Sequence, residues 1–404
     1  ALSDLLTAYA SNGITGLGNE AITLTDSEVS VTDLNTLDTY SSGAIDAQTI
    51  TDITGAVSAL TAAYSSQGIV DLGTNIVITD KVLTTSEINI LDNLSSGRIN
   101  ANSVTTLIGS SASVNTLYDS ALGTGSSASD GVLNLGNESI ILSDSTIDAS
   151  SLVSISSSTS GDIFAGEVGT IQGSIDSINA LYDTHSHIKS LANESITITD
   201  KVGSGTALLT LVDNTTGIID ANSVYKIEGL LQDLNNIYIN QQFIGLNNED
   251  ITLTDVAINS TYDVSNLNTL DGYTAGIINA VNVTTISGSI SDLLISYQAN
   301  GISNLGNEAI TLKDTTNIAA SDLTALAALN TLGSINASSA ATIEGTAAEI
   351  IAAFAESTIT ESSNVALTVN SGTATLAQAR SLDGLTTGVV TAEIADTRVS
   401  DLLG

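Results

Sequence analysis

The sequence is most unusual for the residue types that it lacks. It contains no Cys, Met, Trp or Pro, and aromatic residues make up only 3% of its 404 residues. Without Cys, the fold has no disulfide framework. With no Met and few aromatic residues, the core must consist of Ile, Leu, Val and Ala, which suit thin and regular layers. The absence of Pro is typical of chains whose backbone N–H groups donate to a strand ladder throughout.

Positive charge is also scarce. Eight Lys and Arg stand against 44 Asp and Glu, so the net charge is −36. Nucleic-acid binding requires clustered basic residues, and this composition argues against it. No apolar run approaches the ~18 residues of a membrane span, so we predict a chain that does not span a membrane. A very acidic, Lys-poor surface suits salty water or calcium, where repulsion between charges is screened.

Two motifs recur along the whole chain. "GLGNEAITLTD" (16–26) returns with two changes as "NLGNEAITLKD" (304–314), and the last residue of this motif recurs at Asp26, Asp80, Asp144, Asp200, Asp255, Asp314 and, in a degenerate copy, Asn370. The second motif, first written "GAIDA", ends at Ala47, Ala101, Ala165, Ala221, Ala280, Ala337 and Ala392. We therefore predict one solenoid array over residues 1–404, with about seven repeats of ~56 residues starting near 13, 68, 131, 188, 243, 301 and 364. An insertion is expected near 122–130.

Each repeat consists of two similar halves of ~28 residues, because "VTDLNTLDTYSSGAIDA" and "AVSALTAAYSSQGIVDL" share their apolar spacing and a Tyr. "AITLTD" alternates apolar and polar residues and predicts a half-buried strand. "VTDLNTLDTY" and "AVSALTAAY" have helical apolar spacing. Ser or Thr before an early Asp, as in "SVTD" and "SISD", predicts a helix N-cap. The glycines that follow predict helix ends, at Gly43, Gly97, Gly217 and Gly276.

A half-repeat of this size cannot enclose a core alone, whereas stacked copies bury one another's faces. We predict an α/β repeat solenoid in which parallel β-strands stack coil on coil, with one short helix per ~28-residue half-repeat. The alternative is a string of seven separate domains of ~56 residues. It is less favoured, because such small domains need staples or larger aromatic cores.

Two groups of residues could bind metal. His185 and His187 are the only histidines, and with Asp183 they could hold an ion, although a solvated loop explains them as well. The recurring Asp residues, and the "NE" pairs at Asn19–Glu20, Asn137–Glu138, Asn193–Glu194, Asn248–Glu249 and Asn307–Glu308, could supply oxygen ligands for calcium. The simpler interpretation is a turn-forming Asn and a helix-capping Asp that recur because the fold recurs. We therefore assign no metal or cofactor residue, and calcium stays open.

Catalysis is not expected. Stacked carboxylates could form a polysaccharide-cleaving cleft, but catalytic sites are singular whereas these acids are repeated. The sequence contains no nucleophile elbow, phosphate-binding Gly-Lys loop or His-Glu-x-x-His helix. We predict no enzyme and assign no catalytic residue.

"GNEAITLTD", "LNTLDGYTAG" (267–276) and "VTTISGSISDLL" resemble the repeats of giant acidic cell-surface proteins of marine cyanobacteria, including those linked to swimming. The resemblance implies secretion, an extracellular or cell-surface location, and a structural or adhesive role. We expect a structural protein that forms or extends a filament, stalk or surface layer through head-to-tail stacking, with copies of itself or adjoining repeats as partners. The alternative is a binding module, an adhesin that bridges calcium or glycans.

The two ends of the sequence have the same phase in the repeat. "LSDLLTAYASNGI" (2–14) matches "ISDLLISYQANGI" (290–302), and the chain closes on "VSDLLG". Bare terminal coils of a solenoid expose apolar surface and unpaired strand edges. We therefore expect the strand ladder to continue beyond residue 404, into a longer array or a second subunit.

Overall fold

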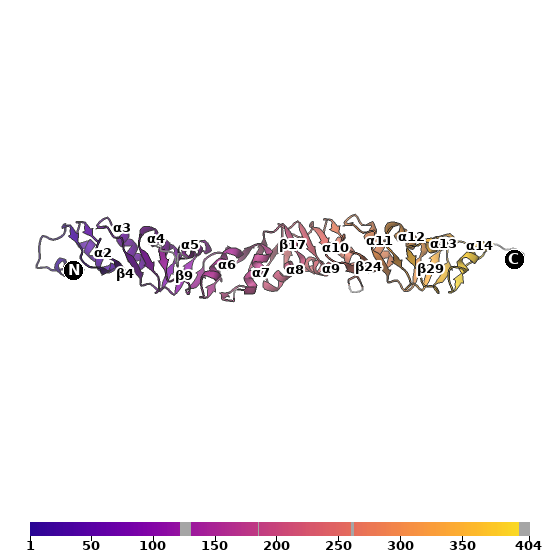
Figure 1. The fold of residues 1–404 in the computed structure, drawn as a ribbon, viewed down its shortest axis with the longest axis horizontal. Coiled ribbons are helices and arrows are strands. Elements are labelled where there is room, and N and C mark those ends of the chain that lie inside the picture. The colour runs from indigo at the N-terminus through magenta and orange to yellow at the C-terminus, as the bar shows by residue number, and fades with distance from the viewer. Residues whose placement is uncertain (122–130, 185, 260–261, 396–404) are drawn as a thin grey trace. The chain divides into compact units, whose positions relative to one another are not determined.

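A computed structural model describes residues 1–121, 131–184, 186–259 and 262–395 of the chain (Figure 1). They form two compact units, residues 1–197 with 214–217 and residues 198–213 with 218–404. Both units have the same α/β repeat architecture, in which short parallel strands alternate with short helices. The expected insertion at 122–130 and the last residues, 396–404, lie outside the described part of the chain.

The helices are two to three turns long, as the sequence predicts. The described residues form fourteen of them, α1 (Leu2–Tyr9), α2 (Val31–Tyr40), α3 (Val57–Ser65), α4 (Thr85–Leu94), α5 (Ser111–Ala121), α6 (Ala149–Ser158), α7 (Ile175–Thr184), α8 (Gly205–Asn214), α9 (Leu231–Ile239), α10 (Val264–Asp271), α11 (Ile290–Gln298), α12 (Ala320–Leu329), α13 (Ala347–Ala355) and α14 (Leu376–Asp383). Helices this short are not stable alone in water, so they depend on packing. We call one helix with its neighbouring strands a coil.

The strands are two to four residues long. In the first half of the chain they are β1 (Ile22–Thr23), β2 (Glu28–Ser30), β3 (Ile45–Asp46), β4 (Asp52–Gly55), β5 (Ile69–Val70), β6 (Asn75–Ile78), β7 (Val82–Thr84), β8 (Arg98–Asn100), β9 (Thr106–Gly109), β10 (Gly131–Leu133), β11 (Ser139–Leu142), β12 (Thr146–Asp148), β13 (Ile163–Phe164), β14 (Thr170–Gly173), β15 (Ile188–Lys189) and β16 (Ser195–Ile198). In the second half they are β17 (Val202–Ser204), β18 (Ile219–Asp220), β19 (Lys226–Gly229), β20 (Phe243–Ile244), β21 (Asp250–Leu253), β22 (Ala257–Ile258), β23 (Ile278–Asn279), β24 (Thr285–Gly288), β25 (Ile302–Ser303), β26 (Ala309–Leu312), β27 (Asn317–Ala319), β28 (Ile335–Asn336), β29 (Thr342–Gly345), β30 (Ile359–Thr360), β31 (Ala366–Val369) and β32 (Val390–Thr391).

Strands pair in parallel with the strand two places along the chain, except that β31 pairs with β32, so one sheet draws strands from two or three consecutive repeats. In the first unit the sheets run β1-β3-β5, β10-β8-β6-β4-β2 and β15-β13-β11-β9-β7, with a further pair β12–β14. In the second unit they run β17-β19-β21-β23-β25, β22-β24-β26-β28-β30 and β27-β29-β31-β32, with a further pair β18–β20. Pairing across repeats, as between β4 and β6, confirms the solenoid and excludes the string of separate domains.

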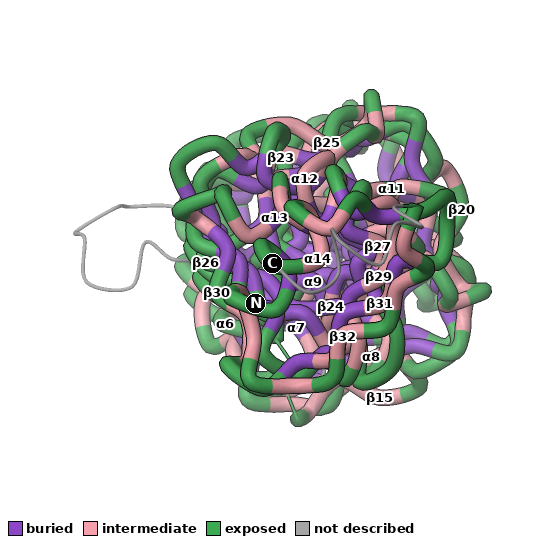
Figure 2. Tube along the Cα trace, turned by 90° about the vertical axis from the view of Figure 1, so that its right-hand side faces the viewer, coloured by how far each residue is buried: buried purple, intermediate pink, exposed green. Residues whose placement is uncertain are grey.

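Ladders of buried Ile hold the coils together. In the first unit Ile53 pairs with Ile76 and Ile76 with Ile99, at the centres of β4, β6 and β8, and all three are fully buried. The second unit repeats this with Ile286, Ile310, Ile335 and Ile359. Figure 2 shows buried positions inside the coils and exposed positions on their outer surface. One or two buried aliphatic residues from most strands fill each coil, which explains why the sequence needs so few aromatic residues.

The glycines of the second motif do not cap the helices as the sequence suggested. Helix α2 ends at Tyr40, and its C-cap Ser41 is extended (φ −119°). Gly43 comes later, where an added Cβ would lie 2.1 Å from the carbonyl oxygen of Glu20 in the preceding coil. The other copies have the same close contact with a backbone carbonyl, at Gly97, Gly161, Gly217, Gly276, Gly333 and Gly388. Glycine is therefore required here for the approach of two coils.

The N-cap prediction is confirmed at one of the two quoted motifs. In "SISD", the Oγ of Ser289 accepts the N–H of Asp292 at 3.1 Å. In "SVTD", Ser30 makes no side-chain cap hydrogen bond within the described residues.

We predict that Gly276→Ala lowers the free energy of unfolding by about 1–3 kcal/mol, because the new methyl group overlaps the carbonyl oxygen of Glu249. The built Cβ lies 2.2 Å from that oxygen. Urea unfolding followed by circular dichroism measures the change. Gly13→Ala is the control, since its nearest neighbour lies at 3.7 Å. Equal midpoints for the two variants would contradict the close-approach explanation.

Candidate functional site: the contacts that join successive coils

Five of the recurring Asp residues cap helices, and each of these five caps the helix of the coil before it. The Oδ2 of Asp26 accepts the backbone N–H of Leu2, the first residue of α1, at 2.8 Å. The same bond links Asp80 to Val57 at 2.8 Å. Three further copies are Asp144 to Ser111, Asp255 to Leu231 and Asp314 to Ile290. We call this contact the Asp cap. A carboxylate at a helix N-terminus satisfies a free N–H and interacts favourably with the helix dipole.

The recurring Glu residues are held inside their own loops. Glu138, Glu194, Glu249 and Glu308 are all at most 2% exposed. In each case a Tyr from the preceding helix donates its hydroxyl to the carboxylate, as Tyr238 does to Glu249 at 2.8 Å. The corresponding pairs are Tyr9–Glu20, Tyr118–Glu138, Tyr182–Glu194 and Tyr297–Glu308. We call this contact the Tyr–Glu latch.

Backbone N–H groups complete the latch. The Oε2 of Glu308 accepts the N–H of Gly306 at 2.9 Å and that of Asn307 at 3.2 Å. A buried carboxylate is stable only when such donors surround it. In the half-buried first copy, the N–H of Gly18 and the hydroxyl of Tyr9 lower the pKa of the Glu20 carboxyl.

Burial raises the pKa of the latch tyrosines well above the usual value, and the neighbouring carboxylate raises it further. Each phenol therefore keeps its proton, and its O–H group donates the hydrogen bond to the carboxylate oxygen.

The latch connects to the next coil through the Glu backbone. The carbonyl oxygen of Glu249 accepts the Thr274 hydroxyl at 2.8 Å, and that hydroxyl oxygen in turn accepts the N–H of Gly276 at 3.0 Å. In the first repeat Ser41 has the place of Thr274. The Thr274–Glu249 hydrogen bond and the required Gly276 are adjacent, so the loop of one coil packs directly against the next coil.

A third contact joins neighbouring helices. The side-chain amide of Asn35 in α2 donates to the carbonyl of Ala59 in α3 at 2.9 Å. Similar bonds run from Asn89 to Ser113, from Asn235 to Asn266 and from Asn268 to Asp292. All three contacts use polar side chains to satisfy groups of an adjacent coil.

Of the residues considered for metal binding, the Asp and Glu residues above are engaged in caps and latches. The helix-capping interpretation of Asp is thus confirmed at Asp26, Asp80, Asp144, Asp255 and Asp314. Within the described ranges, no group of three or more His, Asp or Glu is placed to hold a metal ion.

The two histidines do not provide a metal site in the described structure. His185 lies outside the described residues. The Nε2 of His187 lies 2.9 Å from the Ser156 hydroxyl and 3.1 Å from the Ser156 carbonyl oxygen. His187 therefore takes part in another contact between coils. Asp183, which precedes it in the sequence, has an exposed side chain.

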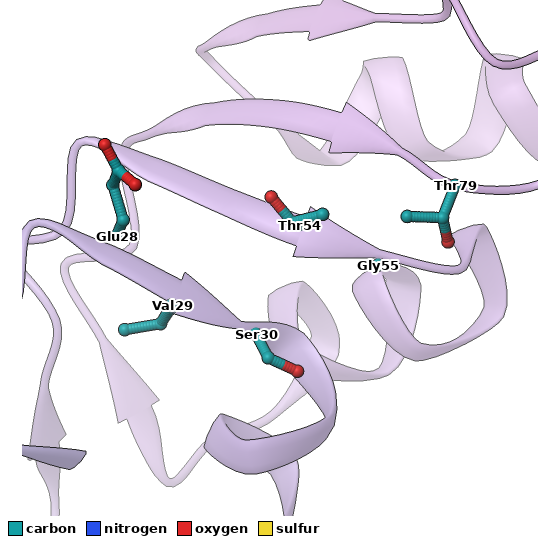
Figure 3. Close-up of a pocket in the computed structure, with 6 residues that line it drawn as sticks. All are labelled: Glu28, Val29, Ser30, Thr54, Gly55 and Thr79. Atoms are coloured by element: carbon teal, nitrogen blue, oxygen red, sulfur yellow. The ribbon is translucent and has the colours of Figure 1, made fainter. Parts of the chain in front are cut away.

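Two hollows on the described part of the surface do not gather reactive groups. One is lined by Glu28, Val29, Ser30, Thr54, Gly55 and Thr79. Its side chains are spread along neighbouring strands and do not point to a common centre (Figure 3). Another is lined by Val281, Asn304, Leu305, Gly306, Asn307 and Leu332. Neither pairs a nucleophile with a base, which a catalytic site requires.

Register within the strands corrects one sequence alignment. Ile310 pairs with Ile286, and Leu367 takes the same place opposite Ile343. Asp314 follows Ile310 by four residues, so its counterpart is Ser371 and not Asn370. The prediction at Asn370 is wrong because Asn370 has the place of Lys313, one residue before the Asp position.

Sequence reasoning missed the Tyr–Glu latch. Its signal is a Tyr that precedes the recurring Glu, by eleven residues in the pairs Tyr9–Glu20, Tyr238–Glu249 and Tyr297–Glu308.

Models of known protein families give no match to the chain, and a search of curated proteins gives none either. Within the described residues, no helix has the length and apolar character needed to cross a membrane.

We predict that the latch behaves as a coupled pair. Tyr297→Phe should lower the free energy of unfolding by about 1–3 kcal/mol, because the buried Glu308 loses a donor. Glu308→Val alone should also destabilise, because the Tyr297 hydroxyl is then unpaired. The double variant should recover most of the loss, since replacing both partners of a buried polar pair by apolar groups is often neutral.

A double-mutant cycle on these variants, measured by urea unfolding, gives the coupling energy. The chain contains its own version of the double variant, because Phe354 and Val365 have the places of Tyr297 and Glu308 in the next repeat. Additive losses, with no recovery in the double variant, would contradict the latch.

The Asp cap generates a separate prediction. Asp80→Ala removes the partner of the Val57 N–H and should lower the free energy of unfolding by about 0.5–2 kcal/mol. Asp119→Ala is the control, since Asp119 is an exposed carboxylate of α5. Equal unfolding midpoints for both variants would show that the cap contributes nothing.

Proposed function

We propose that the protein is a structural, non-catalytic repeat protein that extends a filament, stalk or surface layer by stacking coil on coil. The observation that supports this most strongly is the division of contacts between coils. Helix N-termini, loop carbonyls and strand edges of one coil are satisfied by groups of the next. Such nearest-neighbour construction is the basis of extendable solenoids.

An extracellular location is part of the proposal. The net charge of −36, which is screened best in saline surroundings, supports it. The resemblance to acidic cell-surface repeat proteins also supports an extracellular location.

The first strand suggests how stacking could continue. Ile22 and Leu24 donate their N–H groups to the carbonyl oxygens of Ala44 and Asp46, at 2.8 and 3.0 Å. The N–H of Thr23 points to the opposite side. In the equivalent strand β6, that opposite side pairs with β4 of the preceding coil. A strand like β4, from an adjoining repeat or a second copy, would complete β1 in the same register.

We predict that the full chain associates with itself, and that Thr23→Pro suppresses association without unfolding the protein. Proline removes only the outward N–H of an edge strand, which sheets tolerate. Sedimentation velocity over a range of protein concentrations measures association, and electron microscopy shows whether the assemblies are linear. Circular dichroism checks that the variant is folded.

Chelation separates this proposal from the calcium-bridging adhesin. Because the recurrent carboxylates are engaged in caps and latches, we expect EDTA to leave both the assembly and its melting temperature unchanged. Dissolution by EDTA would favour the calcium-bridged alternative. A wild-type chain that stays monomeric at all concentrations would contradict self-stacking.

A further inference from the structure

One junction of the array differs from the others in both of its carboxylate contacts. The junction runs from α13 to β31, residues 347–369. At equivalent junctions an Asp follows the strand and caps the preceding helix, as Asp314 caps α11 through the N–H of Ile290. In the α13 junction the counterpart is Ser371.

Helix α13 instead carries its own cap. The Oγ1 of Thr346 accepts the N–H of Glu349 at 3.2 Å, and the Glu349 carboxylate accepts the N–H of Thr346 at 2.8 Å. This is a reciprocal capping box. Helix α3, with Ala56 at its N-cap, has no such side chain and relies on Asp80. At α13 the capping box stands without an Asp cap, whereas α11 has both the Asp314 contact and a local cap from Ser289.

The latch is exchanged in the same junction. Phe354 has the place of the donor Tyr, and Val365 has the place of the acceptor Glu. Both members of the pair became apolar, so neither leaves a buried polar group unpaired. The second repeat differs in a different way, since Tyr64 remains and bonds the Thr74 carbonyl oxygen at 3.3 Å.

We infer that the α13 junction is a boundary of cooperative unfolding built into the array. The coils before it keep their helix caps when the seventh repeat opens, because α13 is capped from within. At the α11 junction, opening of the following coil removes Asp314 and leaves α11 without part of its cap. The seventh repeat can therefore open without removing any part of the α13 cap, even though the β29–β31 pairing is lost, whether or not the chain assembles.

Hydrogen exchange of the full-length protein tests this inference. Leu382→Ala in α14 and Leu326→Ala in α12 each remove a fully buried side chain from the coil after a junction. Leu326→Ala should raise exchange in α11 about fivefold, the factor expected for one lost cap. Leu382→Ala should leave exchange in α13 unchanged. An equal increase of exchange in α11 (from Leu326→Ala) and in α13 (from Leu382→Ala) would overturn the inference.

A reconstructed Asp cap provides the matched control. Thr346→Ala should speed exchange of the α13 N-terminal amides, and adding Ser371→Asp should restore their protection. In that double variant, Leu382→Ala should now raise exchange in α13 about fivefold, as at the α11 junction. Two results would show that the Thr346 capping box and an Asp cap at position 371 are not alternatives. One is that Ser371→Asp does not restore protection of the α13 amides. The other is that Leu382→Ala still leaves exchange in α13 unchanged in the double variant.

Discussion

The parallel strand ladder between coils is the interaction on which the rest of the structure depends. Each strand is only two to four residues long, and each helix is too short to be stable alone. Pairing of strand with strand two places on brings Ile over Ile in successive coils, and buries an apolar face that no single coil could bury. The absence of Pro from the chain keeps every backbone N–H available for this ladder.

The carboxylates make different contacts with the preceding coil and with the following coil, whereas the strand ladder is the same in both directions. The Asp cap reaches back to the preceding helix, while the latched Glu offers its carbonyl to the coil that follows. A chain with 44 acidic residues thus uses part of its negative charge to satisfy N–H and O–H donors inside the fold. These contacts are polar and specific, so they fix the register that a row of similar Ile residues leaves free.

The repeat, the parallel strands and the short helices were predictable, because all three produce periodic patterns in the sequence. Helix capping by Asp was predictable as a residue preference, but its helix was not, since the capped N–H of Val57 lies 23 residues before Asp80. The Tyr–Glu latch was not predicted from the sequence because "NE" was interpreted as a local turn. The role of Gly276 also depends on the neighbouring coil, which a linear pattern does not contain.

The central claim is that each coil is completed by groups of the next. The most direct measurement is amide hydrogen exchange, by NMR, of the Leu231 N–H in the Asp255→Ala variant. The carboxylate of Asp255 accepts this N–H at 2.7 Å from the following coil. The account predicts faster exchange at Leu231 and unchanged exchange at Val264, the first residue of α10, whose N-cap is Asp263. Unchanged exchange at Leu231 would contradict the claim.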